Sequence, residues 1–285
     1  MTLVKRCWDC LPPILDDFVV IFKAPNIIAQ RHAMALRRFY IAPEMIHQNQ
    51  PEITGSDAKH ISRVLRLKPD DTIELFDGTG QGYHARIICV SSKIVRLTIE
   101  SSFAFLSESP VHITLAQAML KDRKMDDLIR PLTELGIDCW MPFYASRSVP
   151  SPKGKGLHKR LARWEKIAVE AVKQCRRGHI PDILPVNDFN AVLAASATCD
   201  GRLLFWEDTN HAFAIPRQAV KRVMLILGPE GGFAPLEVQQ AKDHGFLTAG
   251  LGPRILRAET ATLAAITLVQ YCMGDMGNTL PRDQA

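Results

Sequence analysis

The chain has 285 residues, of which 47% are hydrophobic and 23% charged, and its formal net charge is +5. This length can bury the core of two domains or of one large domain, and the composition is that of an ordinary globular protein. The charge is compatible with a nucleic-acid partner but is too small to identify one. The seven cysteines are scattered, and Cys7 and Cys10 lack a second pair at zinc-site spacing, so we expect no metal site.

The N-terminal segment gives no sign of a membrane anchor. Its longest apolar run, residues 18–28, is interrupted by Lys23 and Pro25 and is too short to span a bilayer. Three acidic residues among the first seventeen argue against a signal peptide. We therefore expect a cytoplasmic protein with no membrane partner. Residues 1–36 show no period and are predicted to be a poorly ordered extension, with Met34 as an alternative start.

Residues 37–108 are predicted to form a small, strand-rich domain. "RRFYIA" is strand-like, and Ser56 or Asp57 can cap a helix through "AKHISRVLRL". The segment 71–102 then alternates β-rich runs with Gly, Asp and Ser turns. His60, Arg63 and Arg66 recur at i, i+3 and i+6, which predicts a basic stripe on that helix.

Residues 109–285 alternate between strands and helices, which predicts an α/β domain with a mostly parallel sheet. The helices show apolar residues at helical spacing or a Pro start and Gly stop. The predicted strands are 111–119, 137–144, 201–207, 221–228 and 247–252, and the predicted helices are 125–137, 158–177, 235–245 and 257–273.

Two glycine-rich loops follow strands of this predicted sheet. They are "LILGPEGGF", residues 225–233, and "LGPRILRAET", residues 251–260. Ligands of open parallel sheets bind beyond the carboxyl ends of the strands. The first loop has neither G-x-G-x-x-G spacing nor the lysine of a P-loop. It suits an adenosine carrying a thioether or sulfonium, and the alternative is a tight strand-to-helix turn.

These loops also carry a family resemblance. "LILGPEGGFAPLEVQQAKDHGF" and "LGPRILRAETATLAAI" resemble the C-terminal signature of SPOUT methyltransferases, and most of all the ribosomal RNA small-subunit methyltransferase E family. "RRFYIAP", "KMDDLIRPLTELGI" and "MPFYASRS" follow the family's order, so the resemblance covers residues 37 to about 274. Lys173, Arg176 and Pro131 depart from the family pattern.

The resemblance implies a fold, a reaction and partners. It implies a C-terminal SPOUT domain with a deep trefoil knot, an N-terminal β-rich PUA-like RNA-binding domain, and a homodimer. It also implies methylation of N3 of a uridine in 16S rRNA, with S-adenosyl-L-methionine as methyl donor and 16S rRNA or the small ribosomal subunit as partner. Two alternatives are methylation of another RNA position (a tRNA base or a ribose 2′-OH) and a non-catalytic RNA-binding assembly factor.

The candidate catalytic residues are Arg254, Arg257 and Glu259. Loss of the uridine N3 proton spreads negative charge onto O2 and O4, which a guanidinium can stabilise. Either arginine could instead hold an RNA phosphate or pair with a carboxylate at the dimer interface. Glu259 could act in catalysis or favour the dipole of the last helix. Glu230 could orient its loop or contact the methyl donor.

The remaining candidate residues follow from the two loops and from local basic clusters. The predicted contacts to the methyl donor are Leu227, Gly228, Glu230, Gly231, Gly232, Leu251, Gly252, Ile255, Leu256, Thr260 and Ala261. The predicted RNA contacts are His60, Arg63, Arg66, Lys121, Arg123, Arg147, Lys159, Arg163, Arg176 and Arg177.

Overall fold

The computed structural model describes residues 36–48, 50–105, 108–149, 156–209, 213 and 220–277. The chain divides into the units Met1–Arg37 and Arg38–Ala285. The predicted extension, with Cys7 and Cys10, lies outside the described residues except for Leu36. Within the described part of the chain, no helix is long and apolar enough to cross a membrane.

A five-stranded sheet forms the first part of the unit Arg38–Ala285. Its strand order is β1-β3-β4-β5-β2, with β1 parallel to β3 and every other pair antiparallel. Alternating apolar residues such as Ile73, Leu75, Val95 and Leu97 form its core. The strands are β1 (Arg38–Tyr40), β2 (Glu52–Thr54), β3 (Thr72–Phe76), β4 (Gln81–Val90) and β5 (Ile94–Ala104).

The helix predicted in this region begins earlier and has a different geometry. α3 (Gly55–Lys59) continues directly into a π-helix over His60–Leu65, and Arg66 ends it in the left-handed region at φ 53°. Because a π-helix bonds residue i to i+5, residues three apart no longer share one α-helical face. The basic stripe is therefore wrong as predicted, although His60, Arg63 and Arg66 are all exposed. A short helix, α2 (Pro43–Ile46), was not predicted.

The rest of the unit contains a parallel sheet, as the alternation of elements predicts. Its order is β12-β10-β11-β6-β7-β8, β9 also pairs with β7, and every one of these pairs is parallel. The two-residue strands β8 and β9 were not predicted from the sequence. The strands are β6 (His112–Ala118), β7 (Cys139–Tyr144), β8 (Asp182–Ile183), β9 (Asn187–Asp188), β10 (Gly201–Phe205), β11 (Arg222–Leu227) and β12 (Leu247–Ala249).

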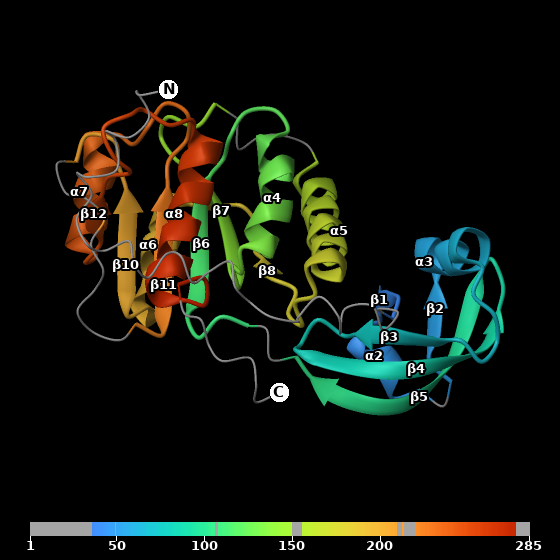
Figure 1. Ribbon diagram of the computed structural model, residues 1–285. Helices are drawn as coiled ribbons and strands as arrows, with labels where there is room; N and C mark the ends of the chain where they lie inside the picture. Colours follow the sequence, from blue (N-terminus) through green and yellow to red (C-terminus); the bar gives the residue numbers. More distant parts are fainter. Residues whose placement is uncertain are drawn as a thin grey trace, which may run out of the picture. The chain divides into compact units, whose positions relative to one another are not determined.

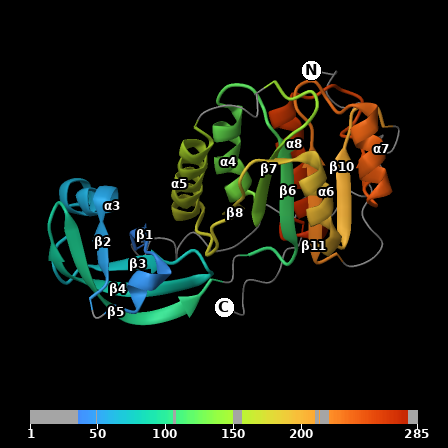
Figure 2. The same cartoon turned by 180° about the vertical axis from the view of Figure 1, so that it is seen from behind.

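Helices cover both faces of this parallel sheet (Figures 1 and 2). Three of them pack on one face: α4 (Lys124–Glu134), α5 (Leu157–Cys175) and α8 (Ala258–Met273). The opposite face carries α6 (Phe189–Ala195) and α7 (Pro235–Asp243). The helix α6 was not predicted. Pro131 lies inside α4, which nevertheless continues to Glu134.

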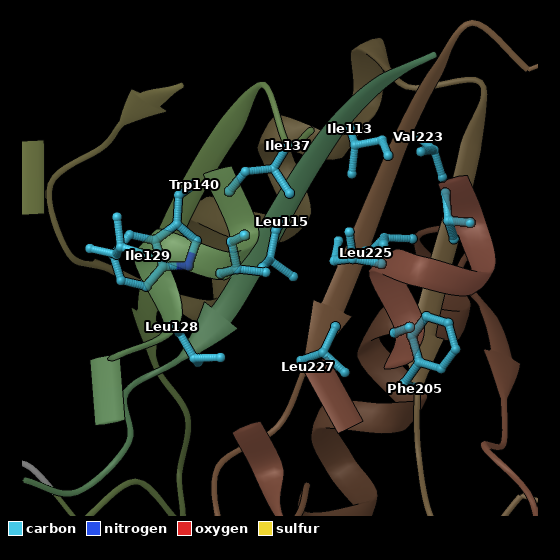
Figure 3. Close-up of a cluster of buried hydrophobic side chains, with 14 of the residues drawn as sticks. Ile113, Leu115, Leu128, Ile129, Ile137, Trp140, Phe205, Val223, Leu225 and Leu227 are labelled. Carbon is cyan, nitrogen blue, oxygen red and sulfur yellow. The ribbon is translucent and has the colours of Figure 1, made fainter. Parts of the chain in front are cut away.

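The alternation of side chains along β11 explains this two-sided core. Val223, Leu225 and Leu227 point into the cluster shared with α4, α5 and α8 (Figure 3), while Met224 and Ile226 join the cluster of α6 and α7. A strand buried on both faces reads as an uninterrupted apolar run, which is why "RVMLIL" contains only one polar residue. The predicted trefoil knot and the domain boundaries at 36/37 and 108/109 stay predictions.

Candidate functional site

A cavity of about 620 Å³ lies at the carboxyl ends of β10, β11 and β12. This volume is in the range of ligand pockets, and the edge is where ligands bind in parallel sheets. Two segments of its wall are the loop after β11 and residues 251–257, which lead into α8. The two glycine-rich loops singled out in the sequence therefore share one cavity.

Most of the candidate residues from these loops line the cavity. Gly231 and Thr260 are not among its lining residues, and neither is Glu259. Arg254 and Arg257 both line it and both are exposed. The predicted methyl-donor contacts in its wall are Leu227, Gly228, Glu230, Gly232, Leu251, Gly252, Ile255, Leu256 and Ala261.

The loop after β11 needs its glycines for space and for backbone conformation. Gly232 has φ +67°, and a Cβ there would collide with the carboxylate of Glu207. A Cβ on Gly228 would lie 3.0 Å from the ring of Phe233. Gly231 instead offers its carbonyl oxygen, which accepts a hydrogen bond of 3.1 Å from Arg147 Nη1. A larger residue at Gly228 or Gly232 would therefore displace the wall of the cavity.

A buried polar pair holds this loop against α8. Thr262 Oγ1 donates a 2.6 Å hydrogen bond to Gln117 Oε1 at the end of β6. The Gln117 amide nitrogen donates to the carbonyl of Ala118 at 3.1 Å and contacts that of Gly228 at 3.4 Å. Both side chains are fully buried, where unpaired polar groups are costly. The pair therefore fixes the glycine loop relative to the last helix.

Lys124 connects the two carboxylates at the rim of the cavity. Its Nζ lies 3.1 Å from Glu230 Oε1 and 3.2 Å from Glu259 Oε2. Glu230 also accepts a hydrogen bond of 3.1 Å from the backbone nitrogen of Lys121. Glu230 thus attaches the glycine loop to the start of α4, and Glu259 attaches the start of α8 to the same lysine.

These contacts shift the ionisation of the two main partners. Burial would raise the pKa of Glu230, but backbone hydrogen bonds and Lys124 outweigh burial and lower that pKa. The hydrogen bond to Glu230 raises the pKa of Lys124. Both groups are therefore charged at neutral pH, and a carboxylate of lowered pKa is a weak base.

Several residues of the cavity wall received no role from the sequence. They are Phe205, the last residue of β10, and Trp206, Glu207 and Thr209, which follow it. The available signal was the acidic residue directly after the apolar run "LLFW". It was not interpretable alone, because only the strand order places the end of β10 beside those of β11 and β12.

The predicted RNA contacts are exposed, with one exception. His60, Arg63, Arg66, Lys121, Arg123, Arg147, Lys159, Arg163 and Arg176 are all exposed. Arg147 and Arg163 have contacts within the protein that bear on their availability. Arg147 bonds the glycine loop, and Arg163 Nη2 lies 3.0 Å from Asp126 Oδ2. Lys173, which departs from the family pattern, pairs with Asp57 at 2.8 Å and with Glu170 at 2.9 Å.

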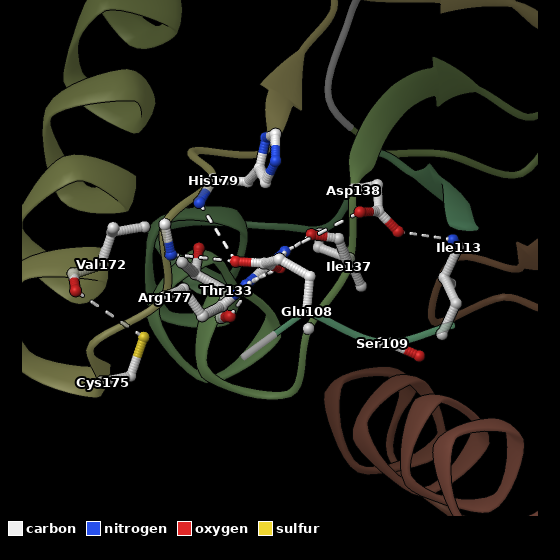
Figure 4. Close-up of polar contacts among 12 residues, drawn as sticks. Glu108, Ser109, Ile113, Thr133, Ile137, Asp138, Val172, Cys175, Arg177 and His179 are labelled. Carbon is white, nitrogen blue, oxygen red and sulfur yellow. Dashed lines mark hydrogen bonds and ion pairs between the residues drawn. The ribbon is translucent and has the colours of Figure 1, made fainter. Parts of the chain in front are cut away.

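Arg177 occupies a buried position that contradicts its predicted role in RNA binding (Figure 4). Its Nε and Nη2 donate to Glu108 Oε2 at 3.0 and 2.8 Å. Its Nη1 donates to the carbonyl oxygens of Thr133 and Ile137 at 2.9 and 2.8 Å. Every guanidinium nitrogen is paired within the protein and only 5% of the residue is exposed, so Arg177 is too buried to contact an RNA phosphate.

Among the described residues, no group of three or more His, Cys, Asp or Glu side chains could hold a metal ion. The chemical groups at the cavity are therefore cations, carboxylates, backbone amides and apolar walls. This set can bind a zwitterionic ligand and stabilise negative charge that develops on a substrate.

Comparisons with known families match most of the described chain. Residues 107–270 match the model of an RNA methyltransferase domain, and residues 53–100 match that of an RNA methyltransferase PUA domain. The cavity lies entirely in the first match, and strands β3 and β4 lie in the second.

Individual relatives give the same result over nearly their whole length. The ribosomal RNA small subunit methyltransferase E of Buchnera aphidicola is 32% identical over 84% of this chain and 94% of its own. That of Bacillus subtilis is 31% identical over 77% of this chain and 89% of its own. The crystal structure of the Neisseria gonorrhoeae protein of that name, bound to S-adenosyl methionine, superposes with a TM-score of 0.76 at 30% identity, covering 85% of this chain and 99% of that one.

Proposed function

Because the chain belongs to the ribosomal RNA small subunit methyltransferase E family, we propose that it methylates N3 of a uridine in 16S rRNA. The methyl donor is S-adenosyl-L-methionine. The observation that carries this proposal is the cavity at the sheet edge, with Arg254 and Arg257 in its wall. The family resemblance seen in the sequence and the family-model match both include the residues that line this cavity.

The cavity fits the chemistry of the proposed donor. Gly228 and Gly232 leave room that a Cβ would fill, so the backbone can approach a ligand closely. Leu227 and Leu251 offer apolar contact for an adenine. The wall also combines carboxylates with cations, which suits a ligand that carries a sulfonium, an amino group and a carboxylate. The roles of the individual contact residues are part of the proposal.

The donor supplies an electrophilic methyl group, and the residues of this chain supply position and charge. The N3 proton of the uridine passes to solvent, and Arg254 or Arg257 stabilises the charge that its loss leaves on O2 or O4. Glu230 and Glu259 hold Lys124 in place at the rim, which orders the loop and the start of α8 together. Since the pKa of Glu230 is lowered, we assign it this positioning role and not that of the general base.

We further propose the domain limits 37–108 and 109–285, a homodimer and a cytoplasmic location. The gap between the last strand of the first sheet, ending at Ala104, and the first strand of the second, starting at His112, supports the boundary. Ile255 in the cavity wall is 92% exposed, and Tyr271 on α8 is 56% exposed. We propose that the partner subunit covers Ile255, the exposed apolar side chain in the cavity wall.

The decisive experiment is methyl transfer to defined rRNA. Purified protein is incubated with labelled S-adenosyl-L-methionine and either naked 16S rRNA or small subunits from a strain that lacks the modification. We expect N3-methyluridine in a nuclease digest of the product. Label in another nucleotide, or in a ribose, would replace the proposed target, and calorimetry without donor binding would support a non-catalytic RNA-binding protein.

A further inference from the structure

A second cavity, of about 300 Å³, lies between the start of α4 and the N-terminal half of α5. We call it the α4–α5 cleft. Cations outnumber carboxylates in its wall by four to two, so the cleft is electropositive. The cations are Arg123, Lys159, Arg160 and Arg163, and the carboxylates are Asp122 and Asp126.

One of the two carboxylates is already paired within the protein. Asp126 Oδ1 accepts a 2.6 Å hydrogen bond from the indole nitrogen of Trp164, and Asp126 Oδ2 lies 3.0 Å from Arg163 Nη2. Trp164 is 1% exposed, so it fixes Asp126, and Asp126 in turn holds Arg163 at the cleft. The side chain of Arg163 is still 53% exposed, which leaves the guanidinium accessible to a ligand.

The cleft and the cavity of the proposed methyl donor share the first turn of α4. Lys124, the first residue of α4, lines the first cavity, whereas Arg123, directly before it, and Asp126, in the first turn, line the cleft. An α-helix with its side chains is about 10–12 Å across. The two sites therefore lie on different sides of one helical turn, a separation that neighbouring nucleotides of one RNA strand can bridge.

We propose that the α4–α5 cleft binds a backbone phosphate of the substrate RNA, close to the nucleotide whose base enters the first cavity. Arginine and lysine are the side chains that bind phosphate oxygens, and such contacts fix the register of a strand without reading its sequence. This inference rests on the proposed function, because RNA is the ligand. It assigns Arg123, Lys159, Arg160 and Arg163 to one phosphate site, separate from the exposed cations elsewhere.

The test compares two cations of the cleft, Lys159 and Arg160, with a lysine of the same helix that lies outside it. Lys159 lines the cleft, whereas Lys166 is exposed on α5 and belongs to neither cavity. Binding of unmethylated 16S rRNA to Lys159→Ala, Arg160→Ala and Lys166→Ala is measured between about 50 and 200 mM salt. We expect the slope of log K against log salt to fall by about 0.7–1 for Lys159→Ala and for Arg160→Ala. Lys166→Ala should keep the wild-type slope.

The outcomes separate this inference from the proposed function. Wild-type slopes in both cleft variants, or an equal loss in Lys166→Ala, would overturn the phosphate site. Competition by a polyglutamate peptide as strong as that by RNA would identify an acidic protein partner instead. Calorimetry should give one affinity for S-adenosyl-L-methionine in all variants. If the cleft variants lose RNA affinity while the wild type transfers no methyl group, the cleft stands and the proposed reaction fails.

Discussion

Lys124 and Glu230 form a 3.1 Å ion pair between the first turn of α4 and the glycine loop after β11. The two residues are far apart in the sequence, and their side chains are 30% and 21% exposed. The pair closes one side of the cavity, because both residues belong to its wall. The order of the methyl-donor site should therefore depend on charges that lie outside the glycine motif itself.

Replacing Glu230 by Gln should show this contribution as a pH dependence of stability. The folded-state pKa of Glu230 is lowered, so its contribution is present above the unfolded pKa of about 4.3 and is lost as pH falls through the folded pKa. For a partly exposed pair we expect a decrease of at most about 1 kcal/mol in the free energy of unfolding at pH 7. Denaturant unfolding of the wild type and Glu230→Gln from pH 7 to pH 3 should show their stabilities converging at the acid end.

A matched change at Glu165, which is exposed on α5, serves as the control for Glu230→Gln. Glu165→Gln removes the same charge outside the cavity and should leave the affinity for S-adenosyl-L-methionine unchanged. Glu230→Gln should weaken that affinity several-fold, because the loop loses its attachment to α4. Equal affinities in the two variants would show that the ion pair does not order the site.

Gly232→Ala should impair both folding and binding of the methyl donor. The positive φ of Gly232 costs an alanine about 1–2 kcal/mol, and the new Cβ must also push Glu207 or the loop out of place. Gly156, at φ +109°, has nothing within 4 Å of the position that a Cβ would take, so Gly156→Ala introduces the strain without a collision. Calorimetry should give at least a tenfold weaker affinity for Gly232→Ala only. If Gly156→Ala binds S-adenosyl-L-methionine equally weakly, the collision with Glu207 does not explain the loss of affinity.

Arg177→Met should destabilise the protein more than the loss of an exposed arginine does. It leaves the carbonyl oxygens of Thr133 and Ile137 without their donor and Glu108 without its cation. Breaking a buried ion pair costs about 3–5 kcal/mol. Arg86→Met removes an exposed arginine 2.8 Å from Glu100 and should cost at most about 1 kcal/mol. Similar denaturation midpoints for the two variants would contradict the structural role of Arg177.

The burial of Arg177 could not be predicted from the sequence, whereas other features could. Strands such as β11 and the two glycine loops were predictable, because periodicity and turn residues are local signals. The burial of Arg177 depends on Glu108, Thr133 and Ile137, which are 40 to 69 residues away. A basic residue in a basic run is ordinarily exposed, so the local pattern pointed to RNA.

Parts of the site were missed for the same physical reason. Glu207 lines the cavity only because β10 lies between β11 and β12. No single segment of the sequence determines the order of the strands. The π-helix over His60–Leu65 replaces the expected α-helix, and it contains no proline or glycine that would have predicted the change. The strands β8 and β9 are two residues long, too short for any period to be read.

Arg254 and Arg257 both line the cavity, and their roles can be separated by experiment. Replacing the arginine that stabilises charge on the uridine should lower kcat by about 10²–10³-fold without changing the affinity for RNA, because that charge exists only as the methyl group transfers. Replacing one that holds a phosphate should instead weaken RNA binding and reduce its salt dependence. Single-turnover methylation and salt-dependent RNA binding of Arg254→Ala and Arg257→Ala therefore assign each residue. If neither variant loses more than twofold in either measurement, neither arginine serves the reaction, and the proposed mechanism of charge stabilisation is wrong.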